Sequence, residues 1–179
     1  ELLLKIQSAL ETNYPIRDSI TKDGFNVSTF VFRSSNIREQ LTKYNIVRNK
    51  TYTYSFPTNL KQEYIASFIK GYWDGDGTVC LSGGYPRTSL CSYRKEFLEE
   101  VIDKLYILYN IPKVKVYKKK DSNTWYFQYS CESSKKLYHL FYKNTSSLFL
   151  ERKYLKFKEL FDDIESHEPA ASQAEDKIV

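Results

Sequence analysis

The chain has 179 residues, 41% of them hydrophobic and 16% aromatic, which is enough for the core of one compact domain or of two small halves. Charged side chains make up 27%, and no apolar run approaches the roughly 18 residues of a membrane helix, so we expect no membrane partner. The formal net charge is +5. Because residues 162–179 hold six acidic side chains and one lysine, residues 1–161 carry about +10. This charge indicates either that the protein binds a polyanion such as nucleic acid or that its surface is simply basic.

Taken in chain order, hydrophobic periodicity and turn residues predict hairpins that lie between helices. The expected helices cover 1–13, 36–44, 60–73, 95–109, 134–143 and 151–165. The expected strands cover 15–21, 25–33, 77–82, 86–92, 112–119 and 124–132. Turn residues separate the paired runs, as in Ser82-Gly83-Gly84. This order indicates an α+β fold with antiparallel sheets.

The three cysteines, Cys80, Cys91 and Cys131, have no CxxC spacing and are odd in number. This pattern argues against a disulfide framework and against a zinc site. Two of the cysteines lie in strand-like runs, where we expect small buried side chains, and the natural setting is a reducing compartment.

The predicted elements repeat along the chain. A helix, a hairpin, a second helix and a basic segment occur in residues 1–50 and again, about 100 residues later, up to residue 153. The second copy is preceded by the 60–73 helix and the 77–92 hairpin, whereas the first copy has no such front; a true duplication would place about 50 further residues before Glu1. We expect the remainder of a first repeat in 1–57, a second repeat in 58–165 and a disordered polar tail in 166–179.

Two carboxylates stand at the end of the 60–73 helix, within the stretch FIKGYWDGDGTV. At a helix C-terminus, Asp74 and Asp76 oppose the helix dipole, each at a cost of roughly 0.3–1 kcal/mol. A bound divalent cation would offset this cost, while the plainer interpretation is a solvated turn. Gly71 would allow the backbone of another helix to approach closely. Gly75 and Gly77 are typical of a helix C-terminus that ends in left-handed backbone.

The segment Ile69–Gly77 resembles the nine-residue LAGLIDADG motif, and the segments NIVRNKTYTYSFP and LFLERKYLKF resemble parts of the same family, the LAGLIDADG homing endonucleases. The likeness extends over almost all of 1–165 and includes one complete motif rather than two. It implies duplicated αββαββα halves of the monomeric two-repeat type, with saddle-shaped antiparallel sheets on duplex DNA. It also implies a pseudo-twofold pair of motif helices at the centre.

The resemblance also implies roles for single residues. Asp76 matches the acid that holds Mg²⁺ at the scissile phosphates, with Mn²⁺ or Ca²⁺ as substitutes, and Gly75 is a second candidate metal contact. The candidate catalytic residues are Asp76, Lys50 and Lys153. The motif residues with a structural role are Gly71, Asp74 and Gly77. Metals between paired carboxylates would activate water and neutralise the leaving oxygen, and a lysine would steady the developing charge.

Alternation along the predicted strands yields candidate DNA-binding residues, because a two-stranded ribbon fits the major groove and its polar face can read base edges. In the first repeat the candidates are Arg17, Ser19, Asn26, Ser28 and Arg33. In the second they are Thr78, Ser82, Arg87, Ser89, Ser92, Lys113, Lys115, Tyr117, Lys119, Thr124, Tyr126, Gln128 and Ser130. Each of them individually could equally be solvated strand surface.

Two functions of different kinds remain open. The first is a site-specific, metal-dependent endonuclease for double-stranded DNA, encoded in an intron, an intein or a phage. The second is a non-cleaving nucleic-acid binder on the same fold, such as an intron-splicing maturase or a DNA-binding regulator. The nuclease would be a monomer if an N-terminal motif exists, and otherwise would need a partner chain for the second acid. Its compartment would be reducing and contain DNA, as in a bacterial or phage-infected cytoplasm or an organelle.

Overall fold

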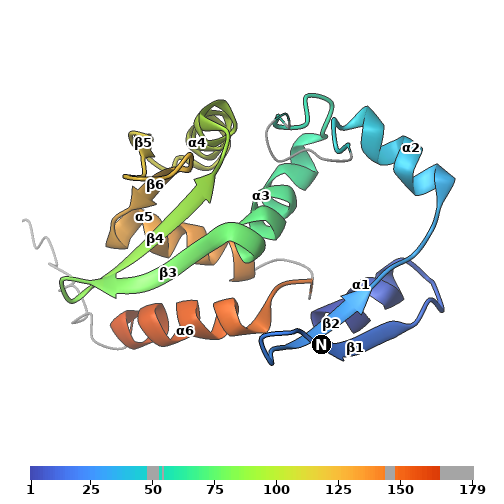
Figure 1. Cartoon of the computed structure of the whole chain (residues 1–179). Coiled ribbons are helices and arrows are strands. Elements are labelled where there is room, and N and C mark those ends of the chain that lie inside the picture. The colour runs from blue at the N-terminus through green and yellow to red at the C-terminus, as the bar shows by residue number, and fades with distance from the viewer. Residues whose placement is uncertain (48–52, 54, 144–147, 166–179) are drawn as a thin grey trace, which may run out of the picture.

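The computed structural model describes residues 1–47, 53, 55–143 and 148–165, and the side chains up to residue 161. Two parts of unequal size lie side by side in Figure 1: a small N-terminal part and a larger part built around one four-stranded sheet. Within the described ranges, no helix is long and apolar enough to cross a membrane. The predicted tail 166–179 lies outside the described residues.

The N-terminal part contains helix α1 (Leu2–Ala9), the hairpin of β1 (Ile16–Ile20) and β2 (Asn26–Phe30), and helix α2 (Ser35–Lys43). The Ser34 side chain caps α2 by accepting a hydrogen bond from the Ile37 N–H at 3.2 Å, as expected for a serine before the first helical turn. No residue in 1–47 is buried. This part of the described chain therefore has no core of its own.

The larger part begins with helix α3 (Gln62–Asp76), strands β3 (Gly77–Ser82) and β4 (Tyr85–Ser92), and helix α4 (Lys95–Tyr109). It continues with β5 (Tyr117–Lys118), β6 (Trp125–Tyr129), α5 (Cys131–Tyr138), the π-helical turn η2 (His139–Lys143) and α6 (Glu151–Glu165). The four strands are all antiparallel, in the order β3-β4-β6-β5.

The core lies between one face of this sheet and the helices. Ile69 and Trp73 of α3 are fully buried, and the Trp73 ring packs edge-on against Phe127 of β6 at 6.0 Å between centroids. Burial alternates along β4, where Thr88, Leu90 and Ser92 are buried and the residues between them are half exposed. Because successive side chains point to opposite faces of a strand, the other face of the sheet is left open.

The α+β fold with antiparallel sheets is confirmed, and α1–β1–β2–α2 has the same element order as α4–β5–β6–α5. The described residues contain one helix that carries the acidic motif, so the predicted pairing of two such helices stays a prediction, as do the domain boundaries.

Three local expectations were wrong. The strand expected over 112–119 pairs only at Tyr117–Lys118. The helix expected from residue 134 begins at Cys131. The acidic helix does not end in left-handed backbone: α3 runs through Asp76, and Gly77 has a φ of −81°.

Gly77 is needed for a different reason. A Cβ at Gly77 would lie 2.3 Å from the Trp73 indole, so the end of α3 packs tightly against its own tryptophan.

Candidate active site at the end of α3

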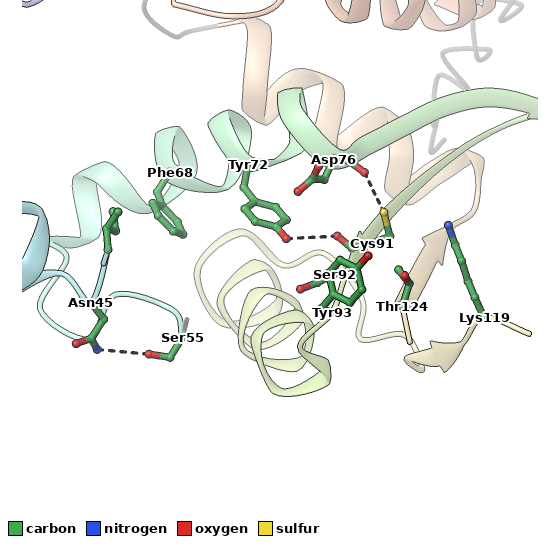
Figure 2. Close-up of a pocket in the computed structure, with 11 residues that line it drawn as sticks. Asn45, Ser55, Phe68, Tyr72, Asp76, Cys91, Ser92, Tyr93, Lys119 and Thr124 are labelled. Atoms are coloured by element: carbon green, nitrogen blue, oxygen red, sulfur yellow. Dashed lines mark hydrogen bonds between the residues drawn. The ribbon is translucent and has the colours of Figure 1, made fainter. Parts of the chain in front are cut away.

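Asp76 is the last residue of α3, and its side chain is exposed at one edge of a cavity of about 460 Å³. Figure 2 shows Tyr72 and Cys91 beside it, and Lys119 and Thr124 across the cavity. The Cys91 thiol donates to the Asp76 carbonyl at 3.4 Å, and the Tyr72 hydroxyl donates to the Cys91 carbonyl at 3.4 Å. The Asp76 carboxylate is therefore exposed to solvent, while the Asp76 backbone is hydrogen-bonded to Cys91 of β4.

The Asp74 carboxylate is buried and makes hydrogen bonds within the protein. Its carboxylate accepts hydrogen bonds from the Tyr142 hydroxyl at 3.0 Å and from the Leu150 N–H at 2.9 Å, and it is 6% exposed. Burial first, and then the Asp74 charge, raise the pKa of Tyr142. Since Leu150 directly precedes α6, Asp74 fixes the start of that helix and does not face the cavity's solvent as Asp76 does.

Lys153, in the first turn of α6, reaches back to the end of α3. Its buried ammonium donates to the carbonyl oxygens of Trp73 at 2.8 Å and of Gly77, and lies 3.5 Å from that of Gly75. Burial lowers the pKa of Lys153, aided by Arg152 and opposed by Asp74 and Asp76. The second candidate lysine, Lys50, lies outside the described residues.

The second candidate metal contact, Gly75, lies directly before Asp76 in the last turn of α3. Gly75 is exposed, and its carbonyl oxygen is 3.5 Å from the Lys153 ammonium. A carbonyl oxygen has two lone pairs, so this contact leaves one of them for a cation. The metal roles of Gly75 and Asp76 both stay predictions.

One exposed carboxylate fits half of a divalent-cation site. Hard cations take several oxygen ligands, and the described part of the chain holds no group of three or more His, Cys, Asp or Glu side chains that could bind a metal. A complete site at Asp76 would therefore need oxygen ligands besides the acidic side chains of these residues.

The open face of the sheet brings most candidate DNA-binding residues of the second repeat together. Register places Thr78 opposite Ser89 and Ser89 opposite Gln128, so these three form one row across β3, β4 and β6. Directly paired residues share a face of the sheet. By the same alternation this face carries Thr78, Ser82, Arg87, Ser89, Tyr117, Lys119, Thr124, Tyr126, Gln128 and, just past the strand, Ser130. The Lys115 ammonium lies over the Tyr117 ring at 5.7 Å.

Two candidates of this repeat lie elsewhere. Lys113 pairs with Asp103 at 2.5 Å and lies over the Tyr106 ring, so it contacts α4 on the covered side of the sheet, because the chain there is not yet a strand. Ser92 is 5% exposed, and its hydroxyl accepts from the Arg94 N–H at 3.0 Å, which places it in the turn that leads into α4.

The first-repeat candidates do not share one face. In the β1–β2 hairpin, Arg17 is opposite Thr29 and Ser19 is opposite Val27, whereas Asn26 and Ser28 belong to the other side. The Ser28 hydroxyl also donates to Asp18 at 2.6 Å. Arg33 is exposed and lies beyond the end of β2. A single duplex on this hairpin can meet only one of the two sets.

Sequence reasoning missed Cys91, Tyr72 and Tyr142. Cys91 could have been found, because the two-residue turn at Gly83-Gly84, where both φ angles are positive, fixes a register that places residue 91 beside residue 76. Tyr72 could also have been found, because it is four residues before Asp76 on the same helix face. Tyr142 lies in a π-helical turn that carries no local sequence signal.

A helix that ends in an exposed acid beside an open antiparallel sheet is the arrangement that the resemblance to LAGLIDADG proteins implies. Residues 63–153, half of the chain, match the LAGLIDADG-like domain family, and the chain belongs to this family of homing endonuclease-like proteins.

Three individual proteins are similar to it. The structure titled "The homing endonuclease I-WcaI bound to its DNA recognition sequence" matches with a TM-score of 0.54 and 14% identity, over 87% of this chain and 70% of that one. The meganuclease I-AabMI bound to uncleaved DNA matches with a TM-score of 0.46 and 16% identity, over 92% and 78% of the two chains. A DNA polymerase from Thermococcus sp. (strain GE8) is 41% identical over 54 residues, which are 30% of this chain and 3% of the polymerase.

The I-WcaI match shows the fold alone. The polymerase match covers so little of that enzyme that its named activity does not transfer to this chain.

Proposed function

We propose that this protein is a site-specific endonuclease that hydrolyses phosphodiester bonds of double-stranded DNA with a divalent metal. The observation that carries the proposal is the position of Asp76, exposed at the end of the motif helix and next to the open face of the sheet. The fold matches that of a homing endonuclease whose structure contains its DNA recognition sequence.

The chain's own residues would divide the work between sheet and helix end. Arg87, Gln128 and their neighbours on the open face have the donors and acceptors to contact base edges and phosphates in the major groove. Asp76 would hold Mg²⁺, or Mn²⁺ or Ca²⁺ in its place, with a second carboxylate supplied by an upstream motif helix or by a partner chain. When bound, the metal supplies an activated water and neutralises charge at the scissile phosphate.

The cellular setting follows from the same chemistry. Cys80, Cys91 and Cys131 are free and half exposed, and Cys91 lies at the site itself. A reducing compartment that contains DNA suits these thiols, and mobile elements such as introns, inteins or phages are the proposed source of the coding sequence.

The decisive experiment incubates the full-length natural protein with a plasmid library that carries randomised duplex segments, with Mg²⁺ or with EDTA. Metal-dependent ends at one sequence support the proposal. The Asp76→Asn variant should bind the selected sequence and leave it uncut. Asp103→Asn is the matched control, since it removes a helical carboxylate on the covered side of the sheet, and it should cut normally.

One observation favours a second candidate function, that of a non-cleaving binder such as a maturase or a DNA-binding regulator. The Lys153 ammonium is occupied by backbone carbonyls, so it has no hydrogen bond to the Asp76 carboxylate. Tight, salt-sensitive binding without cutting in the same experiment, or specific binding of intron RNA, would support this alternative over the nuclease.

A further inference from the structure

Helices α3 and α6 are joined at their ends by two interactions. In each of them, a charged side chain from one helix binds backbone groups at the end of the other. The end of α3 exposes carbonyl oxygens, which attract a cation, and the start of α6 exposes N–H groups, which attract an anion. Lys153 of α6 donates to the carbonyls of Trp73 and Gly77, while Asp74 of α3 accepts from the Leu150 N–H. Each helix thus caps the other, although the partners are 76 to 80 residues apart in sequence.

These interactions lie on both sides of the exposed Asp76. The Lys153 ammonium contacts carbonyls on both sides of Asp76 in the sequence, those of Gly75 and Gly77, while the Asp76 carbonyl accepts from Cys91. The backbone on either side of Asp76 is therefore held, while its carboxylate makes none of these bonds and stays exposed.

The position of Lys153 does not suit direct contact with a substrate. Its side chain is 7% exposed, and its ammonium has three donor hydrogens directed at backbone carbonyls. To reach a phosphate, the ammonium would have to leave the carbonyls of Trp73 and Gly77, which would then lose their charged donor at the helix end.

We propose that Lys153 is a positioning residue: it caps the C-terminal turn of α3 and thereby holds the Asp76 carboxylate in place for a divalent cation. This role deepens the proposed nuclease function and rests on it for the chemistry. The capping itself is independent of cleavage and can be tested without DNA.

The first test measures amide hydrogen exchange of the full-length protein and of Lys153→Met, which keeps the length of the side chain and removes its donors. Exchange of the Gly75, Asp76 and Gly77 amides should be about ten- to a hundredfold faster in the variant. Lys158→Met is the matched control, because Lys158 is exposed on the same helix, and it should leave these amides unchanged.

The second test adds Mn²⁺ alone and follows paramagnetic broadening of the backbone resonances of residues 75–78. Lys153→Met should need several-fold more Mn²⁺ for the same broadening, and Lys153→Arg, which keeps a charged donor, should recover part of the difference. If Lys153→Met does not fold, the arginine variant alone should still show an intermediate Mn²⁺ requirement. Because no DNA is present, a failure of the proposed nuclease function would not alter this result.

Two outcomes would overturn the proposal. Unchanged amide exchange together with a lower maximal cleavage rate at saturating metal would make Lys153 a catalytic residue. Faster exchange with an unchanged Mn²⁺ requirement would reduce it to a structural lock between two helices.

Discussion

Single residues at the end of α3 explain how two acids are tolerated at a helix C-terminus. The sequence suggested that a cation offsets their cost. The structure provides a cation from within the chain, the Lys153 ammonium, and turns Asp74 toward the N–H end of α6. Both interactions follow the helix dipoles. Neither partner could be predicted from local sequence, because α3 and α6 are brought together only by the tertiary fold.

Two buried tyrosines predict opposite effects of the same substitution. The Tyr129 hydroxyl is buried without a hydrogen-bond partner among the described residues, so Tyr129→Phe should raise the free energy of unfolding by about 1 kcal/mol. The Tyr142 hydroxyl donates to Asp74, so Tyr142→Phe should lower it by about 1.5–3 kcal/mol. Urea denaturation of both variants tests this pair, and a destabilised Tyr129→Phe would contradict it.

The same tyrosines predict a loss of stability in alkali. Burial raises the pKa of Tyr129 and Tyr142 above the usual value of 10.0, so above pH 10 the unfolded chain releases protons that the folded chain keeps. Stability should therefore fall by about 1.4 kcal/mol per pH unit for each tyrosine. Denaturation curves between pH 9 and 11 measure the slope, and Tyr129→Phe should make it shallower. An equal slope in the variant would show that Tyr129 ionises in the folded state.

For two glycines that flank Asp76, Gly75 and Gly77, we predict stability changes of opposite sign on substitution by alanine. A methyl group at Gly77 would collide with the Trp73 indole, so Gly77→Ala should lower stability by about 1–3 kcal/mol. Gly75 is helical and open, with no described atom within 4 Å of a new Cβ, so Gly75→Ala should raise stability by up to about 1 kcal/mol. Thermal unfolding of the two variants checks the contrast, which fails if both move the midpoint in the same direction.

At the scale of elements, sequence pattern predicted helices and hairpins well where periodicity was long and turns were explicit. The bounds of α4 and α6 agree with the predicted 95–109 and 151–165, and the Gly83-Gly84 turn ends the predicted β3 at Ser82. The 112–119 strand failed because its alternating pattern lacks a partner strand: Lys113 is held by α4, and only Tyr117–Lys118 reach β6. Alternation predicts which residues share a face only where strands pair.

We predict that removing a positive charge from the open face of the sheet weakens DNA binding more than removing one from the covered side. Arg87 lies on the open face, so Arg87→Ala should weaken binding by about 1–3 kcal/mol and make it less dependent on salt. Lys113→Ala removes an equal charge that is already paired with Asp103 on α4, so it should change affinity little. Fluorescence anisotropy with the selected duplex at two salt concentrations measures both. Similar losses for the two variants would mean that the open face is not the DNA-binding surface.

At the scale of the whole molecule, the two parts differ in how they are stabilised. Among the side chains that the structure describes, the buried ones lie in residues 56–161, around Ile69, Trp73 and Phe127. Residues 1–47 instead expose apolar side chains such as Ile20, Phe25 and Val31. The predicted repeat offers a reason for this difference, because the first copy lacks the helix and the hairpin that precede the second. Which contacts cover such a surface depends on tertiary partners and cannot be derived from periodicity.

This difference predicts an uneven pattern of hydrogen exchange. Amides of the β1–β2 hairpin should exchange far faster than those of β4 and β6, because exchange protection follows buried packing. Mass spectrometry of the chain in deuterated buffer measures both segments. Equal protection would show that 1–47 is stabilised by contacts outside the described residues.

The mutual capping of α3 and α6 has a consequence for biosynthesis. A ribosome makes Asp76 and the whole open face of the sheet well before it makes Lys153, the residue whose ammonium fastens the backbone around that acid. If Lys153 positions Asp76 as proposed, the sheet is complete on the ribosome before the backbone around Asp76 is held. The proposed metal ligand would then reach its final geometry only after α6 has emerged and docked, which makes this corner of the molecule a late step of folding.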